Sequence, residues 1–166
     1  MATLELYLIR HGLAEDGEAW PDDTKRPLTE EGMARLRRIA RSLARLDVSI
    51  DVLLTSPLVR TRQTAEIVAT AFEPQPAVIA VDALAPGGTQ QAVLAELEKH
   101  TRKTRIGLVG HEPGIGELAA KLIGLRHPLE FKKGAVCRID VSALPPTAAA
   151  SLRWFATPRM LRSMKR

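Results

Sequence analysis

The chain alternates between short apolar runs and longer segments whose apolar residues recur every three or four positions. Short apolar runs bounded by polar residues or glycine are typical of strands in a buried parallel sheet, and the longer periodic segments are typical of helices. The expected strands contain 6–9, 52–55, 77–81 and 105–110, and the expected helices lie at 30–46, 58–68, 90–100 and 115–123. This alternation predicts a parallel sheet with helices on both faces.

The helix expected after Thr29 has the clearest pattern. Thr29 is placed to cap its N-terminus, and Glu30 and Glu31 favour the positive end of its dipole. Its apolar positions form one stripe at helical spacing: Leu36, Ile39, Ala40, Leu43 and Leu46. We therefore expect this helix to pack on the sheet and to be structural.

The last third of the chain adds an extension to this pattern. Strands are expected at 134–141 and 151–157, separated by a proline-containing turn at 143–146, and Thr157-Pro158 begins a short basic helix. These segments predict an edge hairpin or an extension of the sheet. Residues 1–166 are thus predicted to form a single domain, a three-layer α/β/α sandwich with a mostly parallel central sheet.

Composition is that of an ordinary globular protein. The chain has 166 residues, of which 45% are apolar and 26% charged. Its single cysteine, Cys137, excludes an intramolecular disulfide and a cysteine metal cluster, and we expect a small core residue in a cytoplasmic protein. The beginning of the chain has neither a basic segment nor a long apolar segment, so no signal peptide or membrane association is predicted.

The net charge of +5 raises the question of nucleic-acid binding. Its distribution argues against this role, because the basic residues gather on the first helix and at the C-terminal tail. Only one Tyr and three Phe are present, so stacking platforms for bases are nearly absent. A solvated basic face, or attraction to anionic substrates and acidic partner proteins, explains the charge better.

The first candidate for chemistry is the end of the first strand, where the apolar run stops at Arg10-His11-Gly12. Arginine presents a planar fork to two oxygens, histidine is a nucleophile or proton carrier near neutral pH, and glycine lets the backbone approach closely. Together they suit a phosphate, although the tripeptide alone is equally compatible with a solvated strand end. A polar, aperiodic segment at 13–27 is expected to form an irregular flap beside it.

Two further strand ends have the same chemistry. The strand at 52–55 runs into Ser56-Pro57, where Pro57 is expected in the first turn of a helix that also contains Arg60. The strand at 105–110 stops at His111. Ligands bind at the carboxyl ends of parallel strands, so these arginines and histidines are expected to meet around one phosphate.

The residue types divide the work of phosphoryl transfer. We expect His11 to attack phosphorus and form a phosphohistidine intermediate, with its other ring nitrogen held as a donor by a nearby carbonyl. Arg10, Arg60 and a protonated His111 would surround the equatorial oxygens, and Gly12 would help to bind the phosphate. Water then hydrolyses the phosphoenzyme.

These motifs resemble those of the histidine phosphatase (phosphoglycerate-mutase-like) superfamily. The resemblance rests on Arg10-His11-Gly12, on Ser56-Pro57 with Arg60 and Gln63-Thr64-Ala65, and on Gly110-His111. Small size, the pattern Asp23…Arg26-Pro27-Leu28-Thr29…Gly32, and Gly110-His111-Glu112-Pro113 are most similar to the short SixA-like phosphohistidine phosphatases. The resemblance implies a phosphoglycerate-mutase-like fold. It also implies hydrolysis of phosphohistidine on a histidine-containing phosphotransfer protein, and hence a part in signal transduction.

The sequence departs from larger superfamily members at the general acid. The segment 84–88 contains no glutamate, which leaves Asp82 and Glu112 as the candidates for that role. An alkoxide leaving group gains roughly 10²–10⁴ in rate from general acid catalysis. Imidazole leaves from a phosphoramidate far more readily. The empty position therefore favours phosphohistidine over ordinary phosphate esters.

Two alternatives stay open. The chain could be a phosphatase for a small phosphorylated substrate that recruits Asp82 or Glu112, or a module that binds phosphate without turnover. No histidine pair has metal-ligand spacing, so no metal and no other cofactor is predicted. His100 and His127 are expected to be solvated, and no sequence feature indicates an oligomeric state.

Overall fold

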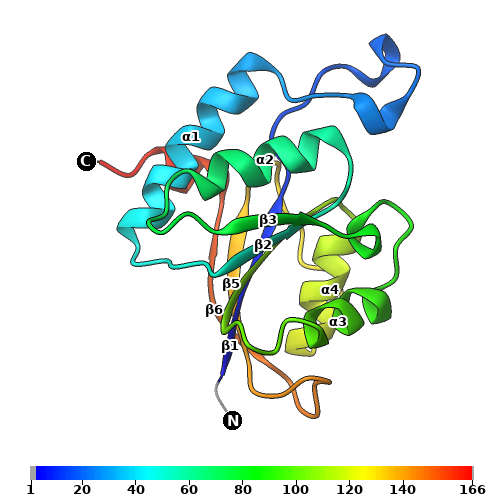
Figure 1. Cartoon of the computed structure of the whole chain (residues 1–166), viewed down its shortest axis with the longest axis vertical. Helices are drawn as coiled ribbons and strands as arrows, with labels where there is room; N and C mark the ends of the chain where they lie inside the picture. Colours follow the sequence, from blue (N-terminus) through cyan, green and yellow to red (C-terminus); the bar gives the residue numbers. More distant parts are fainter. Residues whose placement is uncertain (1–2, 166) are drawn as a thin grey trace.

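A computed structural model describes residues 3–165, in which six strands form one sheet with the order β3-β2-β4-β1-β5-β6 (Figure 1). The strands are β1 (Leu4–Arg10), β2 (Val52–Thr55), β3 (Ala77–Ala80), β4 (Arg105–Gly110), β5 (Val136–Val141) and β6 (Ser151–Ala156). Strands β1 to β4 are mutually parallel, whereas β5 is antiparallel to β1 and β6 to β5. The expected mostly parallel sheet is confirmed, and its last two strands extend it beyond β1.

Helices cover both faces of the sheet, which confirms the three-layer sandwich. They are α1 (Glu30–Arg45), α2 (Val59–Ala69), α3 (Gln90–Glu98), α4 (Gly114–Ile123) and α5 (Pro158–Arg162), with single 3₁₀ turns η1 (Gly17–Ala19), η2 (Asp23–Lys25) and η3 (Asp82–Leu84). One core cluster joins the sheet to α1, α2 and α5, and the other joins it to α3 and α4. No helix within 3–165 has both the length and the apolar character that a bilayer crossing requires.

Helix α1 forms as its sequence predicts, with one exception at its end. The Thr29 hydroxyl accepts the Gly32 N–H at 2.8 Å and caps the helix. Leu36, Ile39 and Leu43 are buried, but Leu46 is 43% exposed because the helix ends one residue earlier. A Cβ on Gly32 would lie 2.2 Å from the Leu13 carbonyl oxygen, so only glycine lets α1 approach the end of β1 this closely.

The start of α2 differs from the expectation in detail. Pro57 precedes the helix, which begins at Val59, because Ser56 and Leu58 first make a turn. The Ser56 hydroxyl accepts the Leu58 N–H at 3.2 Å, and Thr61 donates its hydroxyl to the Leu58 carbonyl at 2.8 Å. Arg60 nevertheless lies in the first helical turn, as expected.

Two other sequence expectations concern the flap and the cysteine. The 13–27 segment projects from the carboxyl edge of the parallel strands, drawn in blue in Figure 1, and is closed at its base by the Glu15 N–H donated to the Pro27 carbonyl at 2.8 Å. Cys137 lies opposite Leu8 in the β1–β5 pair and is fully buried, as expected of a core residue. Burial raises the pKa of its thiol to about 12.

Candidate active site

His11 and His111 meet at the carboxyl ends of two adjacent parallel strands. Arg10 at the end of β1 is paired with Gly110 at the end of β4, so the next residue on each strand is a histidine. The two imidazole ring centres lie 5.2 Å apart with an interplanar angle of 58°. Both side chains are almost fully buried, with 6% and 7% of their surface exposed. The structure thus brings together the two histidines that were expected to meet because each follows the end of a parallel strand.

The main chain fixes the tautomer of His11. Its Nδ1 lies 2.8 Å from the Gly12 carbonyl oxygen, which can only accept, so Nδ1 holds the proton and Nε2 keeps its lone pair. The Gly12 N–H is itself donated to the Thr64 hydroxyl at 3.2 Å. This is the arrangement that a nucleophilic Nε2 requires.

His111 is held by a side chain instead. Its Nε2 lies 2.8 Å from the Ser56 hydroxyl, and its Nδ1 has no hydrogen-bond partner among the described residues. Ser56 follows β2, the strand on the other side of β4 from β1. The imidazole of His111 is therefore positioned by one ring nitrogen and leaves the other free to contact a bound group.

Both imidazoles are neutral at pH 7 in the unliganded protein. Burial lowers the pKa of His11 to about 3 and that of His111 to about 4, and the positive charge of Arg60 adds to the second shift. The sequence suggested a protonated His111. Burial behind three strand ends, which no local pattern reveals, opposes that proton, so a neighbouring anion is needed to favour it.

Arg60 is buried and is paired with the flap. Its guanidinium donates to the Asp23 carbonyl oxygen at 2.9 Å and to the Asp23 carboxylate at 3.0 Å. Desolvation alone would raise the pKa of the Asp23 carboxyl, but hydrogen bonds from Arg26 and Arg60 outweigh it and hold that pKa below its usual range. The flap residue thus orients the arginine that α2 supplies.

Arg10 is held by the loop that precedes β5. Its guanidinium donates to the Phe131 carbonyl at 2.8 Å, and the Gly134 N–H lies 3.1 Å from the carbonyl oxygens of both Arg10 and His11. In residues 3–165, three buried side-chain nitrogens lack a hydrogen-bond partner: Arg10 Nε, Arg60 Nε and His111 Nδ1. All three belong to the predicted site. Unpaired buried polar atoms are costly, and an oxyanion satisfies the two arginine donors and also His111 Nδ1 when that atom is protonated.

Comparison with known proteins indicates the family to which this chain belongs. Residues 6–85 match the model of the histidine phosphatase superfamily (branch 1). A protein of Picosynechococcus sp., itself described only as uncharacterised, is 41% identical over 138 residues, which cover 80% of this chain and 82% of that protein. The chain belongs to the histidine phosphatase superfamily.

Within this superfamily the chain is similar to SixA proteins over nearly its whole length. The phosphohistidine phosphatase SixA of Escherichia coli is 27% identical over 164 residues, which cover 98% of this chain and 99% of that protein. A solved structure of the protein histidine phosphatase SixA complexed with tungstate superposes with a TM-score of 0.83 at 26% identity, covering 94% of this chain and 98% of that one. The expected fold and family are therefore confirmed.

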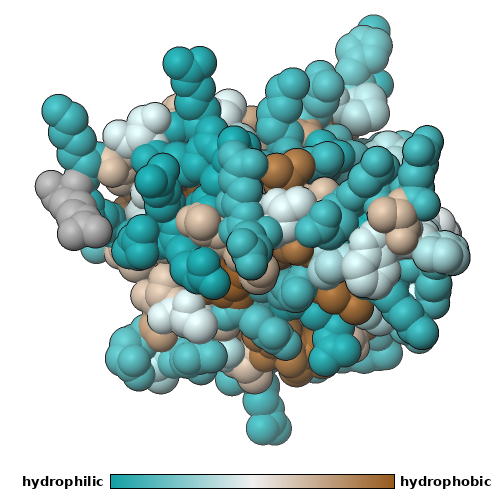
Figure 2. All heavy atoms as spheres, turned by 90° about the horizontal axis from the view of Figure 1, so that it is seen from above, coloured by the Kyte–Doolittle hydropathy of each residue, from teal (hydrophilic) through white to brown (hydrophobic). Residues whose placement is uncertain are grey.

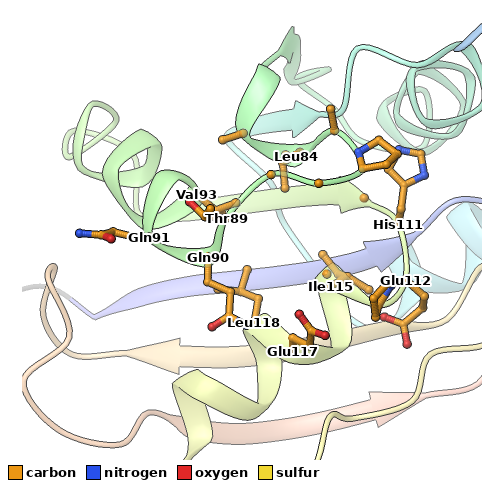
Figure 3. A pocket seen from close by; sticks show the side chains of 18 of the residues that line it. Leu84, Thr89, Gln90, Gln91, Val93, His111, Glu112, Ile115, Glu117 and Leu118 are labelled. Carbon is orange, nitrogen blue, oxygen red and sulfur yellow. The ribbon is translucent and has the colours of Figure 1, made fainter.

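The two carboxylates that the sequence offers as general acids, Glu112 and Asp82, form no hydrogen bond with the two histidines. The Glu112 carboxylate accepts the Gly116 N–H at 2.7 Å and the Phe131 N–H at 3.2 Å, and in Figure 3 it points away from the His111 ring. It thereby joins α4 to the loop that holds Arg10. Asp82 is exposed at the start of η3. Neither is hydrogen-bonded to the histidine pair.

A groove opens beside His111 (Figure 3). It has a volume of about 490 Å³ and runs between the 83–91 segment and the first half of α4. Apolar side chains contribute much of its wall, including Leu84, Val93, Ile115 and Leu118. The groove is lined by His111 and therefore lies next to the histidine pair.

Three residues that position the site were quoted in motifs but given no role: Asp23, Ser56 and Thr64. Each contacts a predicted site residue, Arg60, His111 and Gly12 respectively. These contacts join segments up to 55 residues apart, so no local pattern predicts them. The only indication in the sequence is that each residue lies in one of the motifs on which the family resemblance rests. Within residues 3–165, no group of three or more His, Cys, Asp or Glu side chains is arranged to hold a metal ion.

Proposed function

We propose that this protein is a phosphohistidine phosphatase that acts through a covalent intermediate on His11. The observation that supports this most directly is the set of unpaired nitrogens around the histidine pair, Arg10 Nε, Arg60 Nε and His111 Nδ1. The two arginine nitrogens are donors that suit the oxygens of a phosphoryl group, and His111 Nδ1 becomes one when it is protonated. They accompany a His11 Nε2 whose lone pair is free. Similarity to a phosphohistidine phosphatase and to a tungstate-bound SixA, an oxyanion complex, agrees with the proposal.

In the first step, His11 Nε2 attacks phosphorus while the bond to the substrate nitrogen breaks. The substrate imidazole, protonated on its ring before the transfer, leaves as a neutral group and needs no acid from the enzyme. In the second step, water attacks phosphorus and the bond to His11 breaks. One water proton stays on the phosphate and the other passes to solvent, so His11 returns to its starting tautomer.

The surrounding donors stabilise the charge that develops on the equatorial oxygens. Arg10 and Arg60 contribute fixed positive charge. A phosphate dianion beside His111 opposes the effect of burial and favours protonation at Nδ1, while Ser56 keeps Nε2 in place. Loss of one such donor is expected to cost on the order of 10²–10³ in rate.

The leaving group is the basis for choosing phosphohistidine over phosphate esters. Glu112 is occupied by two backbone N–H groups, and Asp82 is exposed and does not line the groove beside His111. A site without a placed acid suits imidazole better than an alkoxide. We propose a histidine-containing phosphotransfer protein as the substrate, a metal-independent reaction and a role in cytoplasmic signalling.

The test compares substrates and intermediates. Purified protein, treated with EDTA, is assayed on a phosphohistidine protein, on a phosphoramidate and on sugar phosphates, with His11→Ala in parallel. We expect turnover of the N–P substrates only and an acid-labile phosphoenzyme on rapid quenching of the wild type. Faster turnover of sugar phosphates, or full activity of His11→Ala, would overturn the proposal. Loss of activity in EDTA that added metal restores would overturn the metal-independent step.

A further inference from the structure

A second groove lies on the other side of His11. It has a volume of about 540 Å³ and runs between the first half of α1, the 132–134 loop and the start of α5. Its lining includes Arg10 and Gly12, the chain neighbours of His11, whereas the groove in Figure 3 includes His111. A chain segment lying in this second groove would thus pass the end of β1, beside Arg10 and the chain neighbours of His11.

The charge of this groove is of one sign. The residues that line it include six cationic side chains and no carboxylate; the cations are Arg10, Arg35, Lys132, Lys133, Arg159 and Arg162. Within 3–165 only Arg35 among them forms an ion pair, with Glu31. Unneutralised cations along one channel attract and orient an acidic partner.

The groove also has apolar lining. Leu13, Leu36, Ile39 and Pro158 contribute to it, and no aromatic side chain does. Viewed from above the carboxyl edge of the parallel strands, the surface is mostly hydrophilic, with hydrophobic residues showing in hollows between the polar side chains (Figure 2). Apolar side chains between cations suit an amphipathic acidic peptide, whereas a single-stranded nucleic acid would lack a stacking surface.

We propose that this basic groove docks an acidic amphipathic segment of the phosphoprotein substrate, adjacent to its phosphorylated histidine. The inference rests on the proposed function. It adds that a protein substrate is selected by charge outside the phosphate site, and that the dephosphorylated product leaves more easily as salt rises.

Two matched double variants test the groove. Lys132→Glu with Lys133→Glu reverses two adjacent exposed cations at its rim. Arg102→Glu with Lys103→Glu makes the same change in charge at an exposed pair before β4, at the opposite edge of the sheet. The second pair lies outside both grooves, so it controls for net charge alone.

The substrates are two helical peptides that bear one phosphohistidine, with glutamates on the polar face of one and glutamines at those positions in the other. We expect the wild type to prefer the Glu peptide by about 10–100-fold in kcat/KM at low salt, and salt to shrink the preference. Lys132→Glu/Lys133→Glu should abolish the preference, and the control pair should keep it. A preference that is absent from the wild type, or retained by the groove variant, overturns the inference.

Binding is measured separately by fluorescence anisotropy of the unphosphorylated Glu peptide and of a single-stranded oligonucleotide. We expect the peptide to bind the wild type and the control pair but not the groove variant. Tighter binding of the oligonucleotide that the groove variant loses would overturn the inference in favour of nucleic acid. Intact peptide binding without hydrolysis of either phosphopeptide overturns the proposed phosphatase and supports the docking groove. Hydrolysis without a Glu preference overturns the groove alone.

Discussion

His11 and His111 occupy equivalent places on neighbouring strands, yet they are held in opposite ways. A backbone carbonyl fixes His11 at Nδ1 and leaves a lone pair on Nε2, whereas a serine hydroxyl holds His111 at Nε2 and leaves Nδ1 without a partner. A carbonyl can only accept, but a hydroxyl donates or accepts. The first imidazole is therefore limited to one tautomer, and the second can gain a proton without losing its anchor. In the proposed mechanism, these similar positions provide a nucleophile and an adjustable donor.

The largest expected effect separates the two roles. His11→Ala should lose on the order of 10⁴–10⁶ in kcat and form no phosphoenzyme, because the attacking atom is gone. His111→Ala should lose on the order of 10²–10³ and still form the adduct, because it removes one donor. Quench-flow with a labelled phosphoramidate measures both. The exposed His127→Ala is the control, and an adduct in His11→Ala would contradict the assignment.

A smaller effect is expected at the anchor of His111. Ser56→Ala removes a hydrogen bond to Nε2, and a bond of this kind contributes about 1 kcal/mol, so kcat should fall roughly fivefold. Nitrogen NMR of the variant should show shifted signals for the His111 ring and an unchanged single tautomer at His11. An unchanged His111 spectrum in the variant would mean that Ser56 does not hold this ring.

Titration should show how far the two imidazoles differ once an oxyanion binds. In the free protein both should titrate well below the usual pKa of about 6.5, near 3 for His11 and near 4 for His111. Tungstate should raise the pKa of His111 more than that of His11, since its Nδ1 is free to take a proton. Proton NMR with and without tungstate measures the two pKa values. An equal rise in pKa at both rings would contradict the different roles of the two histidines.

The last expected effect is on stability in acid. Below about pH 6.5 the unfolded chain binds protons at both histidines, while the folded chain does not until the pH approaches 4 at His111 and 3 at His11. The free energy of unfolding should therefore fall as pH falls, by up to about 1.4 kcal/mol per pH unit for each group. His111→Gln should flatten this dependence between pH 6 and 4 in urea titrations. An unaltered slope would show that His111 does not titrate differently on unfolding.

Sequence patterns predict the convergence of Arg10, His11 and His111 because alternating strands and helices indicate parallel strands, whose carboxyl ends share one edge of the sheet. The end of a parallel strand is a defined place, so a residue just after it can be assigned to one edge. The contacts of Asp23 with Arg60 could not be predicted in this way. The flap is aperiodic, and its path depends on polar contacts that have no repeat to detect.

Burial and long-range hydrogen bonds were also beyond prediction. The neutral state of His111 follows from desolvation by surrounding segments, and the occupation of Glu112 depends on the Phe131 N–H, 19 residues away. Leu46 and Pro57 differ from the expectation because capping turns, rather than apolar spacing, decide where α1 ends and α2 begins.

The buried thiol of Cys137 has a consequence for oxidative stress. Peroxides react with thiolates, and burial against Leu8 holds this thiol in its protonated, inaccessible form. The proposed nucleophile is an imidazole, which peroxides do not oxidise in the stepwise way in which they oxidise a thiolate. A phosphatase built in this way should keep its activity at peroxide levels that inactivate phosphatases with a cysteine nucleophile.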